Sequence, residues 1–190
     1  GKESLFSNTT ASNNTAVGYE ALKDNTTGTV NTAMGRQALQ NNTTADGNTA
    51  YGHNSLNTVT TGGCNTAVGG SALFNNTGTG NVAVGHSVLQ ANTSAADNVG
   101  IGRNALYTNT EGHSNVGIGR NALYDNTTGD KNIAIGCSAL ANNTTADSNV
   151  AIGHTVLITN TTGTENTAVG HEALYSNTTE NSNSAFGFQA

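Results

Sequence analysis

An internal 17-residue repeat runs through the chain and restricts its fold to a stack of similar units. Each copy starts with an Asn, and the starts follow one another at a constant 17-residue interval, except for one 16-residue interval that lacks a residue near Gly78 to Gly80. The starts are Asn14, Asn31, Asn48, Asn65, Asn81, Asn98, Asn115, Asn132, Asn149, Asn166 and Asn183. We number the positions of each copy as places 1 to 17, beginning with this Asn.

Besides the Asn at place 1, three columns of the repeat never change. Place 5 is Gly from Gly1 to Gly187, place 9 is Leu from Leu5 to Leu174, and place 13 is Thr from Thr9 to Thr178. Strict columns of this kind argue against the alternative of a disordered low-complexity tract. The sequence therefore predicts an all-β repeat solenoid, a parallel β-roll or β-helix with 17-residue coils. We expect residues 1–190 to form a single array of about eleven coils.

The start of each copy has the composition of a short β-strand. Places 2 and 4 carry β-branched residues such as Val150 and Ile152, and side chains two apart point to the same face of a strand. Asn, Thr and Gly are weak helix formers, and no helical stripe of apolar residues appears. We expect places 2 and 4 to face the core. Place 3 is only Ala or Gly, so we expect it on the opposite face, at a close subunit interface that Ala134→Lys would disrupt.

The rest of the copy is predicted to be a corner, a second short strand and a turn. Gly at place 5 readily takes a positive φ and ends the first strand. A second strand then carries Ala-Leu, with the Leu as a second core anchor. The Asn-Thr-Thr-Gly stretch is a turn by composition, because Asn bonds its own backbone and Gly follows for the same conformational reason.

Stacking is what makes a unit this small stable. One copy buries about three side chains, which cannot offset an ordering cost of about 1 kcal/mol or more per residue. If residue n lies over residue n+17, strands pair at about 4.8 Å and the apolar columns merge. Columns such as Asn14, Asn31 and Asn48 can then form side-chain ladders.

The bulk composition limits the partners that the chain could bind. The formal net charge is -6, from 12 acidic and 6 basic residues without any cluster, so nucleic-acid binding is not expected. No apolar stretch is long enough for a membrane span. Cys64 and Cys137 fall at different places of the repeat and predict no disulfide framework. Because the chain opens at a repeat Gly and stops inside a repeat, we interpret it as a segment of a longer fibrous protein.

The sequence supplies no catalytic, cofactor-binding or metal-binding residue set, and we expect no enzyme activity and no cofactor. Place 6 holds four of the five histidines, among them His154 and His171, one coil apart. That column also holds Arg and Tyr and has no third ligand, so we interpret it as a solvated column rather than a metal site.

The Asn-Thr-Thr columns allow two functional interpretations besides a turn. Eight Asn residues lie in Asn-x-Ser/Thr acceptor sequences, which predicts N-glycosylation in a secretory host. They are Asn8, Asn25, Asn42, Asn92, Asn126, Asn143, Asn160 and Asn177. Alternatively, stacked Thr rows could bind ice or carbohydrate, by analogy with other repeat surfaces.

The strand motif resembles a known family of fibres. Residues 132–136 read Asn-Ile-Ala-Ile-Gly and residues 149–153 read Asn-Val-Ala-Ile-Gly. These are similar to the Ser-Val-Ala-Ile-Gly motifs in the head repeats of trimeric autotransporter adhesins, and the whole unit is similar to phage tail-fibre repeats. The resemblance covers essentially the whole chain, although this unit is longer than the adhesin head unit. It implies a left-handed, trimeric β-roll that serves attachment.

Together these observations predict a structural or adhesive fibre segment of a bacterial surface adhesin or phage tail fibre. We expect it to be extracellular, on a cell surface or virion, and to self-associate as a homotrimer or fibril. A host-surface glycan or protein receptor is the expected external partner. The alternative is a ligand-binding array for ice or carbohydrate along the Asn-Thr-Thr face, as an N-glycosylated fibril.

Overall fold

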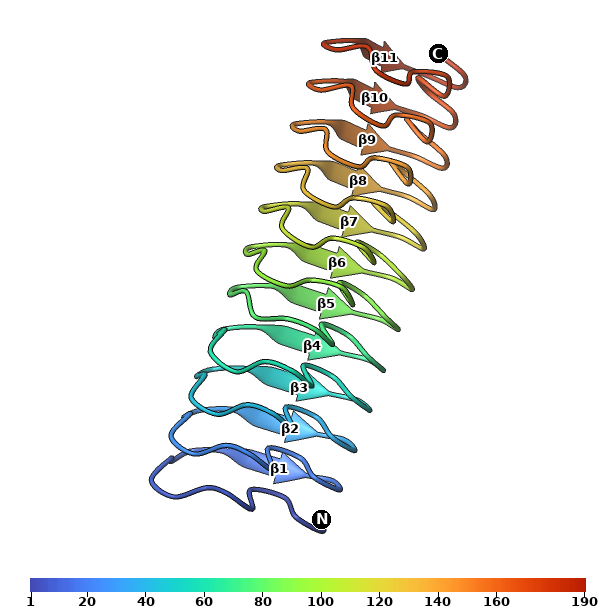
Figure 1. Ribbon diagram of the computed structural model, residues 1–190. Helices are drawn as coiled ribbons and strands as arrows, with labels where there is room; N and C mark the ends of the chain where they lie inside the picture. The colour runs from blue at the N-terminus through green and yellow to red at the C-terminus, as the bar shows by residue number, and fades with distance from the viewer.

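The computed structural model describes all residues 1–190 and shows a β-solenoid in which each copy of the repeat forms one coil (Figure 1). Each coil contributes one three-residue strand, formed by places 2 to 4. The strands are β1 (Thr15–Val17), β2 (Thr32–Met34), β3 (Thr49–Tyr51), β4 (Thr66–Val68), β5 (Val82–Val84), β6 (Val99–Ile101), β7 (Val116–Ile118), β8 (Ile133–Ile135), β9 (Val150–Ile152), β10 (Thr167–Val169) and β11 (Ser184–Phe186).

The strands form one parallel sheet in the order β1 to β11. Thr15 pairs with Thr32, the equivalent residue of the next copy, and this pairing confirms the predicted fold class and registry. Only 20 of the 115 backbone hydrogen bonds lie within strands, and most of the others join neighbouring coils at offsets of 16 to 18. The coils are therefore bonded to each other around most of their circumference. No helix of a length and hydropathy suited to crossing a membrane is present.

The shortened copy keeps this registry. Thr66 of β4 still pairs with the equivalent Val82 of β5, at an offset of 16. The side chain of Asn65 reaches the carbonyl of Gly78, 13 residues on, where Asn48 reaches Gly62, 14 residues on. The missing residue is therefore absorbed in the turn between Thr77 and Gly78, close to where the sequence predicted it.

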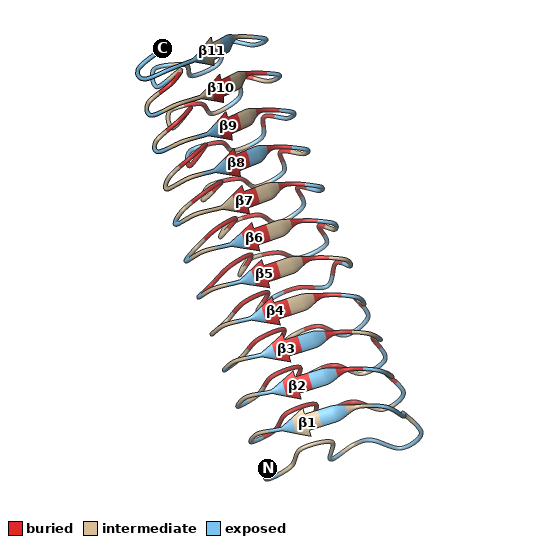
Figure 2. Ribbon diagram, turned by 180° about the vertical axis from the view of Figure 1, so that it is seen from behind, coloured by how far each residue is buried: buried red, intermediate tan, exposed pale blue.

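The core is a thin seam of Leu and small residues. The Leu side chains at place 9 are fully buried from Leu22 to Leu157, together with residues at place 8 such as Ala21 and Ala139. Opposite them lies place 3, the central residue of each strand, which is buried from β2 to β10 (Figure 2). The predicted role of Leu as a core anchor is confirmed.

The predicted orientation of the strand is wrong. Place 3 points inward and places 2 and 4 point outward, so Ala134 is fully buried while Ile133 and Ile135 are each 36% exposed. The residues that limit the size of place 3 belong to the chain itself. A Cβ built on Gly117 would lie 3.1 Å from Leu106 Cγ, and one on Gly100 would lie 2.5 Å from Val88 Cγ1. Place 3 therefore faces this Leu wall and not a subunit interface.

The second strand predicted around Ala-Leu does not form. The segment after place 5 is a series of turns, and both place 7 and the Leu at place 9 have left-handed backbone conformations. Leu22 has a φ of 50° and Leu106 a φ of 54°. A non-Gly residue in this region costs about 1–2 kcal/mol. Burial of the Leu side chain, at roughly 1.5–3 kcal/mol, compensates for this conformation.

Gly at place 5 is required for two reasons. Its φ lies far on the positive side, at 139° in Gly136, where side-chain-bearing residues are strained. A Cβ on Gly136 would also lie 2.1 Å from the carbonyl oxygen of Gly153 in the next coil. The corner that the sequence predicted at this Gly is confirmed.

Two buried Asn columns line the interior beside the Leu seam. At place 1, the backbone NH of Asn48 donates to Oδ1 of Asn31 at 2.9 Å, and the Asn48 side chain donates to the Gly62 carbonyl at 2.9 Å. At place 12, Nδ2 of Asn126 donates to Oδ1 of Asn109 at 2.7 Å and to the carbonyl of Gly129 at 2.9 Å. The predicted Asn ladders and the Asn-based turn are thus both present, and each amide both stacks and closes its turn.

Candidate functional site

The outer surface of the sheet is the most apolar exposed region of the molecule. We define the outer sheet face as places 2 and 4 of β1 to β11. In β5 to β9 both places carry only Val or Ile, while β1 to β4 have Thr at place 2. Exposed large side chains on this face are Val17, Met34, Tyr51, Val68, Val84, Ile101, Ile133, Ile135, Ile152 and Phe186. The sequence shows that these columns are apolar, but the core position predicted for them is wrong.

The face is comparable in area with the largest apolar patch of a typical monomeric protein. The strand spacing of about 4.8 Å and a rise of about 3.3 Å per residue give 11 three-residue strands an area of roughly 500 Å². The largest apolar patch of a typical monomeric soluble protein covers roughly 300–600 Å² and is often functional. On this face the outward residues are all Val or Ile from β5 to β9. The outer sheet face is therefore the candidate functional surface.

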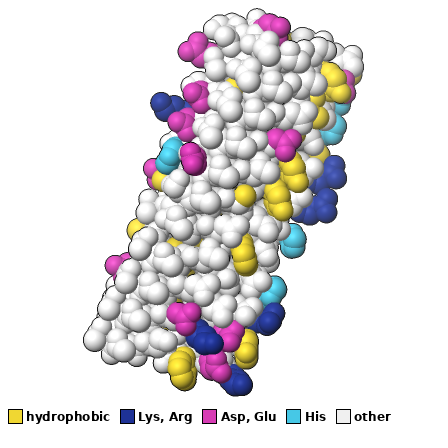
Figure 3. Space-filling model, viewed as in Figure 1, with side chains coloured by type: hydrophobic (Ala, Val, Ile, Leu, Met, Phe, Trp, Pro, Cys, Tyr) yellow, Lys and Arg dark blue, Asp and Glu magenta, His cyan; other side chains and the backbone are white.

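A basic edge borders the face where the strands end. Place 6 carries Arg36, His53, His86, Arg103, Arg120, His154 and His171, and all seven are exposed. Figure 3 shows a row of Lys, Arg and His side chains, in dark blue and cyan, along the right margin of the molecule. No carboxylate lies within salt-bridge distance of Arg36, Arg103 or Arg120. The three guanidinium groups are therefore not neutralised within the chain.

Some residues of the basic edge contact each other along the stack. Arg36 Nη1 lies 3.1 Å from His53 Nε2, and Arg120 Nη2 lies 3.4 Å from Cys137 Sγ. The hydrogen bond from Arg120 holds the pKa of the Cys137 thiol below its usual range.

The two histidines weighed above as a metal pair lie ring on ring within an aromatic column. The ring of His171 stacks on His154 at 5.2 Å between centroids. Phe188 stacks on the other side of His171, at 5.1 Å. The column is therefore held by stacking contacts between neighbouring coils.

An acidic edge borders the other side of the face, where the strands begin. Places 16 and 17 carry Asp46, Asp97, Asp130, Asp147 and Glu165. His113 and Lys131 also lie on this edge, so it is predominantly but not uniformly acidic. The net charge of the chain does not reveal that acidic and basic side chains lie on opposite sides of the face. Places 16 and 6 become the two borders of one strand only when the coil has folded.

The acidic edge is held by hydrogen bonds to the backbone of neighbouring coils. Oδ1 of Asp46 accepts bonds from the backbone NH and the hydroxyl of Thr29, and these hold the pKa of Asp46 below its usual range. Oδ1 of Asp130 accepts from the backbone NH of His113 at 2.6 Å. The carboxylates therefore keep fixed positions at the edge, with their charge available on the outside.

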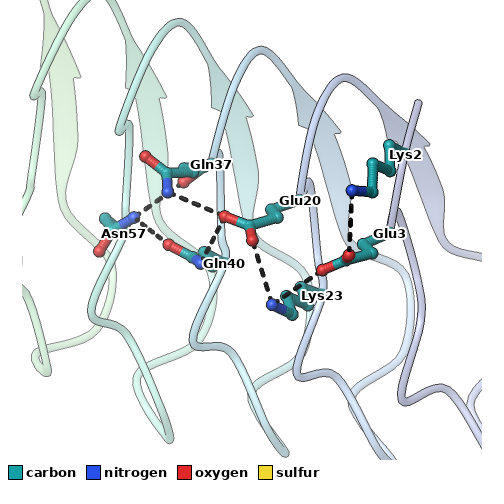
Figure 4. Close-up of polar contacts among 7 residues, drawn as sticks. All are labelled: Lys2, Glu3, Glu20, Lys23, Gln37, Gln40 and Asn57. Atoms are coloured by element: carbon teal, nitrogen blue, oxygen red, sulfur yellow. Dashed lines mark hydrogen bonds and ion pairs between the residues drawn. The ribbon is translucent and has the colours of Figure 1, made fainter.

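A separate polar network covers the opposite wall of the first coils (Figure 4). Glu20 accepts hydrogen bonds from Gln37 at 2.9 Å and Gln40 at 3.0 Å, and it pairs with Lys23 at 3.1 Å. Hydrogen bonding by Gln37 and then Lys23 lowers the pKa of Glu20. Lys23 also pairs with Glu3 at 3.0 Å, and these bonds to Glu3 and Glu20 raise its pKa above the usual range. The network therefore links the first coils to one another through side-chain hydrogen bonds and ion pairs.

The predicted glycosylation sites lie mostly inside the solenoid. Six of the eight Asn side chains are fully buried and belong to the place 12 ladder; these are Asn25, Asn42, Asn92, Asn126, Asn143 and Asn160. The other two, Asn8 and Asn177, belong to the outermost coils. Because the buried amides are engaged in the ladder, attachment of a glycan to them would have to precede folding. Modification itself stays a prediction.

The Thr rows beside this ladder are also engaged internally. The place 13 hydroxyl of Thr127 donates to the carbonyl of Thr144 at 2.9 Å, and Thr144 donates likewise to Thr161 at 3.2 Å. Of the Asn-Thr-Thr motif, mainly place 14 remains outward, as at Thr128. The surface that this motif offers to a ligand is therefore narrower than the sequence suggested.

Comparisons with known proteins identify no relative of this chain. No family model matches it, and neither the curated proteins nor the solved structures give a significant match. The resemblance to adhesin heads and tail-fibre repeats therefore stays a prediction. The fold is that of a structural repeat protein, a parallel β-solenoid with 17-residue coils.

Proposed function

We propose that this chain is a structural segment of an extracellular attachment fibre, on a cell surface or virion, and that it self-associates through the outer sheet face. The observation that carries the proposal is the exposed row of Val and Ile on β5 to β9. A rigid rod with one long apolar side is suited to bundling with copies of itself, and a thin core gains stability from such bundling. The proposal includes no catalytic step and no cofactor.

The fold supports a role as a spacer or shaft. Eleven strands at about 4.8 Å give a rod of roughly 50 Å, and further copies of the repeat would extend it without changing its cross-section. Because each coil contacts mainly its neighbours, length can be varied while surface chemistry stays the same. A receptor glycan or protein would then be contacted by the assembled fibre.

The test is the oligomeric state of the isolated segment and of a face variant, measured by sedimentation velocity. Ile135→Lys adds a charge at an exposed place of β8 and is expected to shift the segment from oligomer to monomer. Thr128→Lys adds the same charge at an exposed turn away from the face and is the matched control. If the wild-type segment is monomeric at every concentration tested, self-association through this face is wrong.

A second measurement addresses the alternative of an ice- or carbohydrate-binding array. The proposed fibre segment should produce elongated particles by electron microscopy, with neither thermal hysteresis nor binding to a glycan array. The internal hydrogen bonds of the place 13 hydroxyls support this expectation. Specific ice or glycan binding that is lost in Thr128→Lys would favour the ligand-binding array instead.

A further inference from the structure

The two charged edges of the outer sheet face carry opposite signs and lie at opposite ends of the same strands. On β6, Asp97 precedes the strand and Arg103 follows it; on β10, Glu165 precedes the strand and His171 follows it. Within one copy the sheet separates these side chains. None of the five acidic-edge carboxylates pairs with a basic-edge side chain of its own chain. The Arg side chains of the basic edge and the carboxylates of the acidic edge are therefore open to charged groups of a neighbouring surface, whereas His171 already lies 3.8 Å from the carboxylate of Glu172.

The direction of a docked copy decides which edges meet. If two copies pack face to face with their long axes parallel, the strand ends of one lie over the strand starts of the other, and the basic edge meets the acidic edge. If the axes are antiparallel, strand starts lie over strand starts, and each edge meets its own kind. Opposite charges steer association, whereas like charges placed together cost several kcal/mol.

The positions of the charged side chains along the stack match when the copies are in register. In that arrangement Asp97 lies level with Arg103 of the other copy, and Asp46 lies level with His53. Asp130 lies within one coil, about 4.8 Å along the axis, of the level of Arg120. Each acidic-edge carboxylate thus has a basic-edge side chain at its own level or at the next.

The apolar pattern favours the same arrangement. Parallel copies in register place the Val and Ile rows of β5 to β9 on each other. Antiparallel copies centred on β7 would also place these rows on each other, but they would overlap only β3 to β11, whereas parallel copies in register overlap all eleven strands. The strand face of roughly 500 Å² and its two edges together approach the roughly 800 Å² per partner of a stable interface.

We propose that the outer sheet face docks a second copy of this chain that runs in the same direction, with the basic edge of each copy against the acidic edge of its neighbour. This inference rests on the proposed self-association and adds its direction and register. The apolar face supplies the affinity, and the charged edges select the parallel arrangement in register over the antiparallel one.

Charge reversal tests the edges. Arg103→Glu/His171→Glu reverses the basic edge and Asp97→Lys/Glu165→Lys reverses the acidic edge, while the apolar residues are unchanged. Each of these two variants is expected to weaken self-association at least about tenfold at low salt, because like charges then meet. The variant with all four substitutions should return close to the wild-type dissociation constant. Glu111→Lys/Asp125→Lys makes the same charge change as the acidic-edge variant at places outside both edges, and it should associate like wild type.

The outcomes separate this inference from the proposed function. If the wild-type segment associates and Ile135→Lys does not, but both edge variants associate as tightly as wild type, the apolar interface stands and the charge alignment is wrong. Failure of the four-substitution variant to recover, while its thermal unfolding matches wild type, would also overturn the alignment. A monomeric wild type removes both proposals.

Cross-linking tests direction independently. In a Cys64→Ser/Cys137→Ser background, Val17→Cys lies near one end of the face and Val169→Cys near the other. A short bis-maleimide cross-linker should join Val17→Cys chains to each other, and Val169→Cys chains likewise. Cross-linked species that form only when the two variants are mixed would show antiparallel docking and contradict the proposal.

Discussion

At the scale of single residues, the interior of each coil is limited by how closely two walls of the chain approach. Place 3 is small because the Leu and Val side chains of the facing wall fill the space over it, as Val88 does over Gly100. The sequence showed the size restriction correctly. It could not show which neighbour imposed it, because hydrophobicity alone assigns the larger Val and Ile to the inside. In a coil this thin, the Leu at place 9 already occupies the interior.

Gly100→Ala tests this packing directly. Gly100 does not need a positive φ, so the added methyl group acts through its contact with Val88, at 2.5 Å from Cγ1. We expect a loss of about 1–3 kcal/mol in the free energy of unfolding, measured by urea denaturation. Val88→Ala/Gly100→Ala should recover most of this loss, because it restores the Ala pair that most other coils use. Additive effects of the two substitutions would contradict the proposed contact.

Place 17 offers a second test at the residue scale. Val30 is 60% exposed and has a φ of 59°, whereas Gly47 and Gly80 occupy the same place with a φ of 69°. Val30→Gly removes the strain of a β-branched residue in a left-handed conformation, but it also raises the conformational entropy of the unfolded chain. Because we expect the first effect to be larger, the free energy of unfolding should rise by roughly 0.5–1 kcal/mol. Thermal unfolding measures the change. Val99→Gly, within β6, is the control and should lower the melting temperature; a decrease in both variants would refute the strain at Val30.

At the scale of the elements, the two Asn ladders and the backbone bonds hold coil to coil. The place 12 ladder has one interruption, because Val59 stands where the other copies have Asn. Val59 is fully buried, and Oδ1 of the preceding Asn42 has no hydrogen-bond donor. An unsatisfied buried polar atom of this kind costs about 1–3 kcal/mol.

Val59→Asn should repair the ladder. Its Nδ2 would donate to Oδ1 of Asn42, and its Oδ1 would accept from Asn76, as in the intact part of the column. We expect a gain of about 1–3 kcal/mol in the free energy of unfolding, measured by denaturant titration. The reverse change at an intact site, Asn109→Val, should cost a similar amount. If Val59→Asn destabilises the chain although it folds, the ladder is not the source of stability that the geometry indicates.

The sequence predicted the period, the corner Gly, the Leu anchor and the Asn-based turn, because each of these depends on local chemistry that repeats in every copy. It did not predict that Leu106 and its equivalents take a left-handed backbone instead of a strand. That conformation is imposed by the closure of a 17-residue coil, and composition does not report it. The charged edges were missed for a related reason, since Asp97 and Arg103 become the two borders of one face only after the sheet has formed.

At the scale of the whole molecule, the solenoid is a rod with distinct sides. One side is an apolar sheet face between a basic and an acidic edge, and the opposite wall is largely polar. The repeat that generates a continuous core also generates continuous surface columns. A preference for one type of residue at one place of the repeat therefore becomes a stripe about 50 Å long on the surface. The proposed self-association follows from this stripe, and so does its direction.

The stacking of residue n over residue n+17 is the claim on which all of this depends. Distances between pairs of spin labels at place 6, measured by pulsed electron–electron double resonance, test it most directly. The labels are attached in a background without the native cysteines, and unlabelled chain is added in excess so that only distances within one chain are measured. Labels at residues 36 and 120 are five coils apart, which predicts about 24 Å, and labels at 36 and 171 predict about 38 Å. A broad distribution centred near roughly 50 Å for the first pair, as for a flexible chain, or distances that do not increase by about 4.8 Å per coil, would contradict the fold.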